Sequence, residues 1–348
     1  MKIVPLIVML LLAMAATSMG LQAKTITVTA QANTPADYYL AAGQPYAYLS
    51  DLIASPDVAE GDVLMLTPGP TSYGNVTVSK GITIQGNGHY NQPEVGIVIF
   101  HGMVVNSSNV TIEGVKIGLG YGGLTVNNQQ SNTGFASFLM RKCHINGGLT
   151  MNNAVNKVHF EGNLFSSSIN IGANRANQAE VVFSNNLFTN NNQLTITKAH
   201  TGFTKSILFV NNTFIGNNYQ NSSYGQVKNT FFVRNVFAGW QFDHDTQGNT
   251  FYHNVMTAAT LPNGNTGSGA DNLLGATITF ENSNGNHTYD YGREDLRLTT
   301  SPYTGEVIGI TDTYVPYGTP ANPQINGLRV ANPTVNQADP IIITTNGN

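Results

Sequence analysis

Short segments in which apolar residues alternate with other residues recur along most of the chain. The segments "VVFSNNLF" at 181–188 and "ILFVNNTF" at 207–214 show the arrangement. Two apolar residues are separated by one position, an Asn follows three positions after the second of them, and another apolar residue stands two positions after that Asn. This arrangement recurs about every 23 residues, ending at Ile117, Ile145, Phe165, Phe188, Phe214, Phe237 and Met256. Alternation with a period of two predicts a strand with one buried face in each segment.

The Asn residues of these segments form a column of their own, at Asn163, Asn186, Asn212, Asn235 and Asn254. Asn tolerates the left-handed backbone conformation better than most residues with a side chain, so we expect it to turn the chain sharply between two strands. With one such Asn in each turn of the fold, its amide can hydrogen-bond to the Asn above and below. The repeat therefore predicts both a bend and a ladder.

A second strand is predicted upstream of each segment, in "LTVNN" from 124, "LTMNN" from 149, "INIGA" from 169, "LTITK" from 194 and "WQFDH" from 240. Two or three strands per period, with few helix signals, predict an all-β parallel solenoid. A propeller blade needs about 40–50 residues, so the period does not fit a propeller.

The first 23 residues have the order of a secretory signal peptide: Lys2, an apolar run, and a short stretch of small and polar residues before Lys24. We expect residues 1–23 to be removed, residues 24–315 to form the solenoid with an N-terminal cap, and residues 316–348 to form a C-terminal extension. No later segment is apolar enough to span a bilayer, and no Cys follows the apolar run to carry a lipid anchor. These features predict a protein that is secreted, periplasmic or held at the cell surface.

Composition narrows the classes of partner. Charged residues make up 10% of the chain and the net charge is −4, which gives no electrostatic footprint for nucleic acid or an anionic membrane surface. The single cysteine, Cys143, rules out a disulfide within the chain, so burial and hydrogen bonding must stabilise the fold. Asn, Thr, Ser and Gly supply the polarity instead.

The Asn column, the apolar columns and the opening "EGDVLMLTPGPTSYGNVTVSKGITIQGNG" resemble the right-handed parallel β-helix proteins of the pectate-lyase-like superfold, over about residues 60–315. The resemblance implies a single-stranded right-handed β-helix, with a short helix in "YAYLSDLIASP" at 46–56 as its cap and "EDLRLTTSPYTGEVIGI" from 294 as its closing segment. The final residues, "PIIITTNGN", predict one more strand. The Trp-Ile-Asp-His and Arg-x-Pro-x-x-Arg motifs of pectate lyases are absent from the sequence, as are the Asn-Thr-Asp, Asp-Asp and Gly-His-Gly motifs of polygalacturonases.

In the enzymes of this superfold, the substrate lies along the outer face of one sheet. Here the "LTVNN" strands and the residues that follow them present small hydrogen-bonding groups outward, at Thr125, Asn127, Thr150, Asn152, Asn170, Thr195, Thr197 and Gln241. Such groups suit the binding of sugar hydroxyls, although the solvated face that any soluble solenoid needs has the same composition. Both interpretations stay open from the sequence alone.

Charged residues follow the same strands and offer a catalytic alternative. Elimination in a uronate polymer needs a base for the C5 proton and a cation beside the carboxylate, and Arg175, Lys198, His200 and Lys228 are chemically able candidates. The other interpretation is a set of unconnected loop charges, because the sequence assigns no base, acid and orienting residue together.

The segment "DHDTQGN" at 243–249 resembles the start of a calcium loop, with Asp243 and Asp245 as candidate ligands. The bidentate Glu expected at the twelfth position is replaced by Asn254, so a polar turn is the alternative to a calcium site. No other cofactor is predicted.

Outward positions on the strands of the Asn segments carry a second pattern. Glu113, Arg141 and Glu161 share one column and predict a ladder of ion pairs. Leu139, Val182, Leu208 and Phe231 in one column, with Val210, Val233 and Tyr252 in the next, predict an apolar outer patch. Such a patch is usually covered, and the tail from about residue 316 is the first candidate for the cover. A platform on which sugar rings stack is the functional alternative.

The sequence thus favours an exported, non-catalytic β-helix protein that binds or adheres to polysaccharide through Thr- and Asn-rich faces. A divergent uronate lyase is one alternative, and a structural solenoid in a surface assembly is another.

Overall fold

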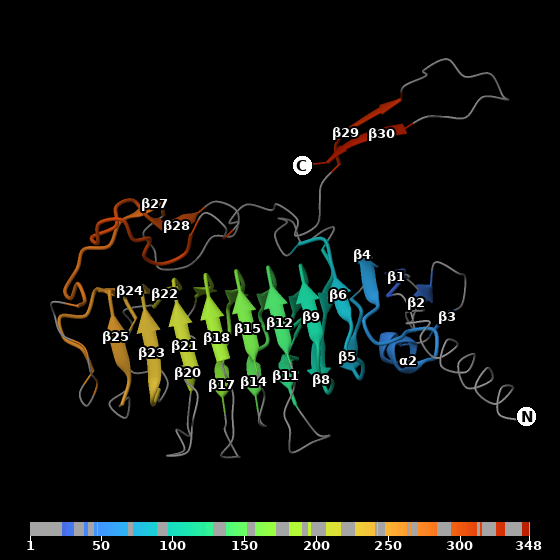
Figure 1. Cartoon of the computed structure of the whole chain (residues 1–348), viewed down its shortest axis with the longest axis horizontal. Helices are drawn as coiled ribbons and strands as arrows, with labels where there is room; N and C mark the ends of the chain where they lie inside the picture. Colours follow the sequence, from blue (N-terminus) through green and yellow to red (C-terminus); the bar gives the residue numbers. More distant parts are fainter. Residues whose placement is uncertain are drawn as a thin grey trace, which may run out of the picture.

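The computed structural model shows an all-β parallel solenoid, in which successive turns of the chain add strands to three sheets (Figure 1). The structure describes residues 23–30, 38–40, 45–46, 48–68, 72–88, 97–120, 122–127, 137–151, 157–171, 181–189, 194–195, 207–216, 227–240, 242, 248–262, 265, 267, 271–283, 294–311, 314, 325–330 and 343–347. For residues 30, 38–40, 45–46, 194–195, 325–330 and 343–347 it describes the backbone alone.

Sheet A has its described strands in the order β25-β23-β21-β18-β15-β12-β9-β6-β4-β1-β2-β3. Its members are β1 (Thr25–Ala30), β2 (Tyr38–Leu40), β3 (Pro45–Tyr46), β4 (Val63–Thr67), β6 (Thr83–Gln85), β9 (Val110–Glu113), β12 (Phe138–Arg141), β15 (Val158–Glu161), β18 (Val181–Ser184), β21 (Ile207–Val210), β23 (Thr230–Val233) and β25 (Thr250–Tyr252). All its pairs are parallel except β1–β2 and β2–β3. Sheet A therefore contains the first strand of each predicted Asn segment.

Sheets B and C complete each turn. Sheet B consists of β5 (Asn75–Val78), β8 (Gly102–Val105), β11 (Leu124–Val126), β14 (Leu149–Met151), β17 (Ile169–Ile171) and β20 (Leu194–Thr195). Sheet C consists of β7 (Ile99–Phe100), β10 (Lys116–Ile117), β13 (His144–Ile145), β16 (Leu164–Phe165), β19 (Leu187–Phe188), β22 (Thr213–Ile215), β24 (Val236–Ala238) and β26 (Val255–Met256). The short strands after each Asn are therefore confirmed, as are the second strands predicted from 124, 149, 169 and 194. The strand predicted in "WQFDH" is not confirmed, because its described residues, Trp240 and Phe242, belong to no strand.

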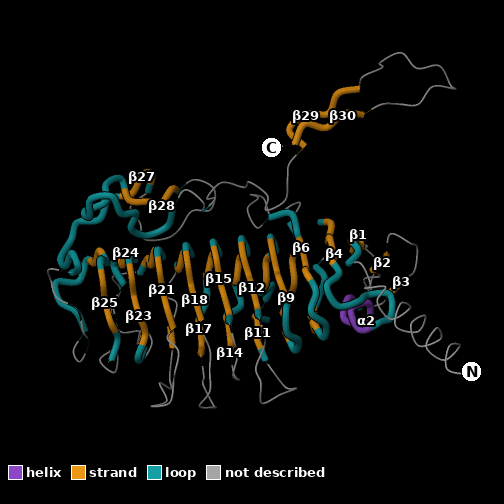
Figure 2. Tube along the Cα trace, in the orientation of Figure 1, coloured by secondary structure: helices purple, strands orange, loops and turns teal. Residues whose placement is uncertain are grey.

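Two antiparallel hairpins and one helix lie outside these sheets. The hairpins pair β27 (Phe280–Asn282) with β28 (Asp295–Leu298), and β29 (Ile325–Val330) with β30 (Ile343–Gly347), so the predicted last strand is confirmed. Helix α2 (Leu49–Ala54) forms within the predicted segment 46–56 and buries Leu49, Leu52 and Ile53. Figure 2 shows how little of the described chain is helical. Within that part of the chain, no helix has both the length and the apolar character that crossing a bilayer requires.

Two stacks of phenylalanine rings fill the core, because the register places the same column of each turn above the last. Phe183 pairs with Phe209 and Phe209 with Phe232, and neighbouring rings are nearly parallel at 4.5 and 5.1 Å between centroids. The second stack runs through Phe188 and Phe214 at 4.4 Å. Edge-to-face contacts join the stacks, so the two predicted apolar columns form one continuous core.

The Asn column forms the predicted ladder. From Asn163 through Asn186, Asn212, Asn235 and Asn254 to Asn272, each side-chain Nδ2 donates to Oδ1 of the next Asn at 2.9–3.1 Å. The same Oδ1 accepts the backbone N–H of the preceding Asn at 2.8–3.0 Å. Each ladder Asn is buried, so these bonds satisfy polar groups that have no access to water.

The expectation that the ladder Asn itself turns the chain is wrong. The residue before it adopts the left-handed conformation, with φ of 55° at Asn185, 54° at Asn211, 55° at Arg234 and 52° at His253. The buried Asn is fixed by its hydrogen bonds and points inward, whereas the position before it takes the bend at the surface. One further turn is also present that the repeat did not predict, because Asn272 extends the ladder and Leu273 bridges to Val255.

After this last turn, the chain reverses along the outside of sheet C. We call residues 294–314 the strap. Three consecutive backbone N–H groups of the strap donate to three successive turns, moving back toward the N-terminus. Gly309 N–H donates to the carbonyl of Arg234 at 2.8 Å, and Ile310 N–H donates to Thr213 Oγ1 at 3.1 Å. Thr311 N–H donates to Asn185 Oδ1 at 2.7 Å. Apolar strap residues pack in one buried cluster with the outward side chains of sheet C; the members include Leu164, Leu187, Val236, Val255, Leu296, Ile308, Ile310 and Tyr314.

Candidate functional site

The outer face of sheet B carries a column of hydroxyl and amide groups. Parallel register aligns one residue from each strand, namely Thr77, Val104, Thr125, Thr150, Asn170 and Thr195. We call Thr77, Thr125, Thr150 and Asn170 the polar column. Thr125 and Thr150 are half-buried and Asn170 is exposed, so these residues lie on the outer face as their alternation predicts. A binding role for them stays a prediction.

A corner built from glycine precedes β11 and β14. Gly122, Gly123 and Gly147 pack backbone against backbone, and a Cβ added to Gly147 would collide with the carbonyl oxygen of Gly122. A Cβ on Gly122 would collide with the carbonyl of His101. No side chain fits at these three positions, so this part of the corner presents backbone alone.

The remaining predicted sugar-binding residues are placed only in part. Asn127 is half-buried, and its N–H donates to the carbonyl of Val105 at 2.9 Å. Thr195 is described by its backbone in β20. Asn152, Thr197 and Gln241 lie outside the described residues.

Most of the predicted catalytic and metal residues also lie outside the described residues, namely Arg175, Lys198, His200, Asp243 and Asp245. Lys228 is described. It lies two residues before β23, is partly buried, and accepts a hydrogen bond from Thr230 Oγ1 on its carbonyl at 3.1 Å. Its lyase role stays a prediction.

Titratable side chains gather on the outer face of sheet A, on strands β9, β12 and β15. Arg141 Nη2 lies 2.8 Å from Glu113 Oε2, which confirms an ion pair between neighbouring turns. The predicted ladder does not extend to Glu161, because Arg141 has no other ion pair within the described part of the chain. The physical reason is burial: the Glu113 side chain is only 7% exposed and needs a charged partner, whereas Glu161 is exposed to water.

His159 and Ser184 form a pair beside this cluster. His159 Nε2 lies 2.7 Å from Ser184 Oγ across β15 and β18. Burial lowers the pKa of His159 from its usual 6.5, and the nearby Glu161 carboxylate opposes this shift. A neutral imidazole beside a hydroxyl could activate a nucleophile. However, no described residue hydrogen-bonds Nδ1 to orient the ring, so the arrangement lacks the third member of a hydrolytic triad.

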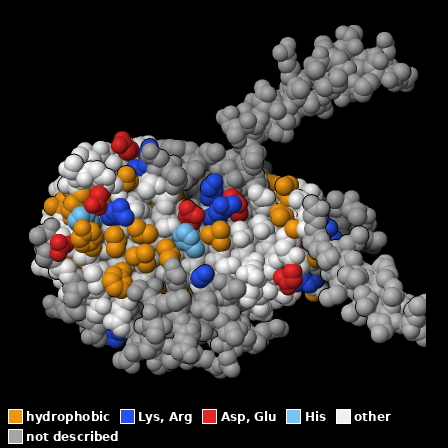
Figure 3. Space-filling model, in the orientation of Figure 1, with side chains coloured by type: hydrophobic (Ala, Val, Ile, Leu, Met, Phe, Trp, Pro, Cys, Tyr) orange, Lys and Arg blue, Asp and Glu red, His pale blue; other side chains and the backbone are white. Residues whose placement is uncertain are grey.

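An apolar strip occupies the other end of this face. We define it as Val182, Leu208, Val210, Phe231, Val233 and Tyr252, on strands β18 to β25. Phe231 is 40% exposed and Tyr252 46%, and the other members are half-buried. Figure 3 shows hydrophobic side chains gathered over this end of the sheet, next to a group of charged ones. The predicted outer patch is therefore present, and only His159 separates Leu139 from it in register.

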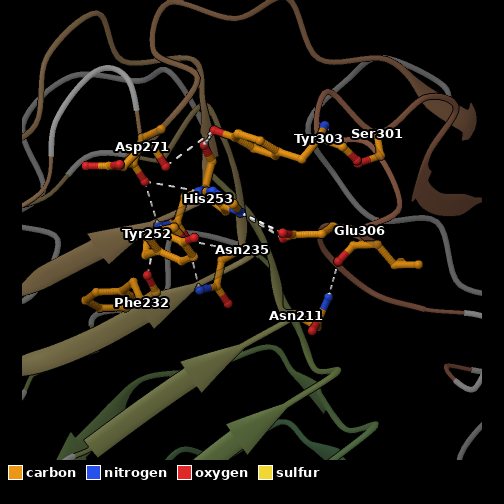
Figure 4. A network of polar contacts seen from close by, with 12 residues as sticks. Asn211, Phe232, Asn235, Tyr252, His253, Asp271, Ser301, Tyr303 and Glu306 are labelled. Atoms are coloured by element: carbon orange, nitrogen blue, oxygen red, sulfur yellow. Dashed lines mark hydrogen bonds and ion pairs between the residues drawn. The ribbon is translucent and has the colours of Figure 1, made fainter.

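A polar network joins the strap to the end of the strip (Figure 4). His253 Nδ1 contacts both carboxylate oxygens of Glu306, at 2.8 and 2.9 Å. The imidazole is stacked between Tyr252 and Tyr303, with ring centroids 3.8 and 4.4 Å away. Tyr303 in turn donates to the carbonyl of Asn254, and Asn211 Nδ2 donates to that of Val307. This network uses a titratable pair to hold the strap, and no substrate-sized space separates the rings.

Other reactive groups in the described residues have limited chemical use. Cys143 is buried, and burial raises the pKa of its thiol to about 12, so it stays protonated and unreactive. No three His, Cys, Asp or Glu residues among those described come together as a set of metal ligands.

Comparison with protein-family models, curated proteins and solved structures found no significant match to this chain.

Two features of the described surface were not predicted as sites. His159 and Ser184 lie in adjacent outward columns, so their contact could have been found by pairing residues diagonally across neighbouring turns. The His253–Glu306 pair joins residues 53 positions apart, and the strap that brings them together has no periodic signal. Only the structure reveals it.

Proposed function

We propose that this chain is an exported, non-catalytic β-helix protein that binds polysaccharide, with the polar column of sheet B as its binding face. The single observation that carries the proposal is the register of Thr125, Thr150 and Asn170 on the outer face of three successive strands. Strands in a sheet lie about 4.8 Å apart, so the column offers a row of evenly spaced hydrogen-bonding groups. A polymer of sugar rings is a ligand that can meet such a row with hydroxyl groups of its own.

The signal-like first 23 residues support export, and the Asn and Phe columns support membership of the right-handed pectate-lyase-like superfold. The glycine corner supports access, because it removes side chains from the approach to β11 and β14. The incomplete His159–Ser184 pair and the inert Cys143 favour binding over catalysis.

The test uses residues 24–348 in affinity electrophoresis through gels that contain soluble polysaccharides, both neutral and uronate-rich. The variant T125V/T150V removes two hydroxyl groups with little change in shape. Each hydrogen bond contributes about 0.5–1.5 kcal/mol, so we expect affinity for the bound polymer to fall roughly tenfold. The matched control is T111V/T250V, which removes half-buried outward hydroxyls from sheet A and should bind as the wild type does.

Equal loss in both variants would place binding elsewhere, and retardation by no polysaccharide would overturn the proposal. Ultraviolet absorbance of unsaturated products should stay unchanged when uronate polymers are incubated with the protein, with and without calcium. An increase in this absorbance would overturn the non-catalytic proposal and support the lyase reaction instead.

A further inference from the structure

The N-terminal end of the solenoid buries a carboxylate. Asp62 directly precedes β4 and is only 1% exposed. Its Oδ1 accepts the backbone N–H of Lys24 at 2.9 Å, and its Oδ2 accepts that of Ala59 at 2.8 Å. No Lys, Arg or His side chain in the described part of the chain forms an ion pair with it. Buried charges in proteins are usually paired, so a positive charge is the partner that these two neutral donors do not supply.

The backbone nitrogen that faces Asp62 is held there by the fold. Strand β1 pairs in parallel with β4 from Thr25 opposite Val63, so Lys24 falls opposite Asp62 (Figure 1). The carbonyl of Lys24 accepts the N–H of Val63 at 2.9 Å, which fixes the residue from its other side. Ala23 and Lys24 are themselves exposed. The nitrogen of Lys24 therefore lies where the chain passes from the surface into sheet A.

The sequence predicts that the chain is cut at this same nitrogen. The signal-like segment has its apolar run first and ends with a small residue, Ala23, which is the kind of residue that precedes a signal-peptidase cleavage site. Lys24 is then the first residue of the mature chain. The cleavage site comes from the sequence and the contact with Asp62 from the fold, so the two observations are independent.

Cleavage changes the chemistry of this nitrogen and leaves it attached to β1. Water hydrolyses the bond between the carbonyl carbon of Ala23 and the nitrogen of Lys24. The hydroxyl group stays with Ala23, which becomes a carboxylate, and the hydrogen goes to the nitrogen. An α-amino group has an ordinary pKa of about 7.7–8.0, so below that pH it takes up a further proton. An ammonium group then takes the place of the neutral N–H that Asp62 accepts in the uncut chain.

We propose that removal of residues 1–23 by a signal peptidase creates an ion pair between the α-ammonium group of Lys24 and the buried carboxylate of Asp62. The proposal rests on the export part of the proposed function and not on sugar binding. A charge-assisted hydrogen bond is roughly twice as strong as a neutral one. The ion pair fastens β1 to β4, so this end of sheet A reaches its full stability only after processing.

The balance between desolvation and attraction favours this pair. A buried ion pair normally costs the desolvation of both charges. Here the carboxylate is already buried in the uncut chain, so cleavage does not desolvate it a second time. Lys24 is exposed and its contact with Asp62 is only partly buried, so the ammonium group keeps part of its hydration. Cleavage therefore adds attraction at little further cost.

Hydrogen exchange followed by mass spectrometry tests the pair in two chains that differ only at their start, residues 24–348 and residues 21–348. Lys24 has a free amine in the first and a neutral N–H in the second. Peptides that cover β4 are identical in both chains and report on the pairing, because the N–H of Val63 donates to Lys24. We expect their exchange to be about five- to tenfold slower in 24–348, since the hydrogen bond to Asp62 is then charge-assisted. Peptides from β21 should exchange equally in both.

Two controls isolate the charge. Acetylation of the α-amine of 24–348 in urea at about pH 6.5, where lysine side chains stay protonated, restores a neutral N–H without adding residues. After refolding, β4 of the acetylated chain should exchange as fast as in 21–348. D62N keeps an acceptor oxygen and removes the negative charge. In this variant the difference between 24–348 and 21–348 should shrink to less than about twofold.

Equal exchange of β4 in 24–348, 21–348 and the acetylated chain would overturn the proposal. A difference that D62N leaves unchanged would also overturn it, because the added residues and not the charge would then be its cause. The intact mass of the chain exported by a host cell provides the second test. Residues 24–348 are expected, and a different N-terminus contradicts the proposal. An uncut chain would refute export as well, whereas equal exchange refutes the ion pair alone.

Discussion

Each ladder asparagine uses its side chain to satisfy two backbone groups of the preceding turn. Asn212 donates from Nδ2 to the carbonyl of Phe183 at 2.9 Å, and its Oδ1 accepts the backbone N–H of Asn186 at 2.9 Å. Both partners are buried, so water cannot replace the Asn if it is lost. The ladder residues are therefore among the least replaceable in the chain.

Replacing Asn212 by Leu should lower the free energy of unfolding by roughly 3 kcal/mol, because buried groups without partners cost about 1–3 kcal/mol each. Denaturant unfolding of N212L measures the loss. The control is N170L on the exposed face, which should stay within about 0.5 kcal/mol of the wild type. Equal stability of N212L and the wild type would contradict a structural role for the ladder.

His159 gives a prediction about pH. Its pKa is lowered in the fold, so the unfolded chain binds a proton at this residue at a higher pH than the folded chain does. The stability linked to His159 is therefore fully present above its unfolded pKa of about 6.5, and is lost as the pH falls through the lowered folded pKa. The fall in Tm between about pH 8 and pH 5 should thus be smaller in H159Q than in the wild type. An identical fall in both proteins would show that His159 is not linked to stability.

At the scale of single elements, each strand of sheet A separates a stacked aromatic core from an outer face. In β21, Phe209 points into the two phenylalanine stacks, and the adjacent Leu208 lies on the apolar strip. The alternation of the strand alone decides which residue belongs to which environment.

Replacing Phe209 by Ala should cost about 3–5 kcal/mol, because it leaves a cavity in the middle of the stack. Leu208→Ala on the same strand should cost clearly less, since that side chain is half-buried already. Urea unfolding of the two variants compares them directly. A smaller loss for F209A than for L208A would reverse the assignment of the two faces.

The strands were predictable because their signal is local and repeated. Residues Phe183, Phe209 and Phe232 occupy one column in the sequence, and they pair in that order in sheet A. The turn that contains Asn272 was missed because it follows a shorter interval and has a single Asn-x-Leu signal. The left-handed residue was misplaced by one position because both positions are often Asn, as at 185–186 and 211–212.

The sites were less predictable than the fold. The outward position of Thr125 and Thr150 followed from alternation, whereas the choice between a binding and a solvated face depends on a ligand that the sequence does not encode. The strap contacts, such as that of Asn211 with Val307, join residues 96 positions apart. Such contacts arise from where the chain returns in space, and no period reports that.

For the whole molecule, the strap ties together turns that otherwise contact only their neighbours. It touches successive turns at His253, Arg234, Thr213 and Asn185. In a simple solenoid, the stability is close to a sum of turns and the contacts between neighbouring turns. Here the strap adds coupling over several turns.

Deleting one turn tests this coupling. Removal of residues 158–180 joins equivalent positions of neighbouring turns and leaves these four strap contacts in place, so we expect a folded chain with a moderately lower Tm. Removal of residues 207–229 deletes Asn211 and Thr213 and puts the strap out of register, so its Tm should fall further. Thermal unfolding followed by circular dichroism compares the two chains. Equal Tm values would show that the strap contributes no coupling.

The ladder also has a direction, which bears on the order of folding. In every step from Asn163 to Asn272, the acceptor for one turn's backbone N–H comes from the turn that follows it in the sequence. Synthesis delivers the N-terminal turns first, so each of them waits for an oxygen that has not yet been made. A nascent chain thus always ends in a turn with an unpaired donor. The strap, made after all these turns, then closes over the assembled solenoid.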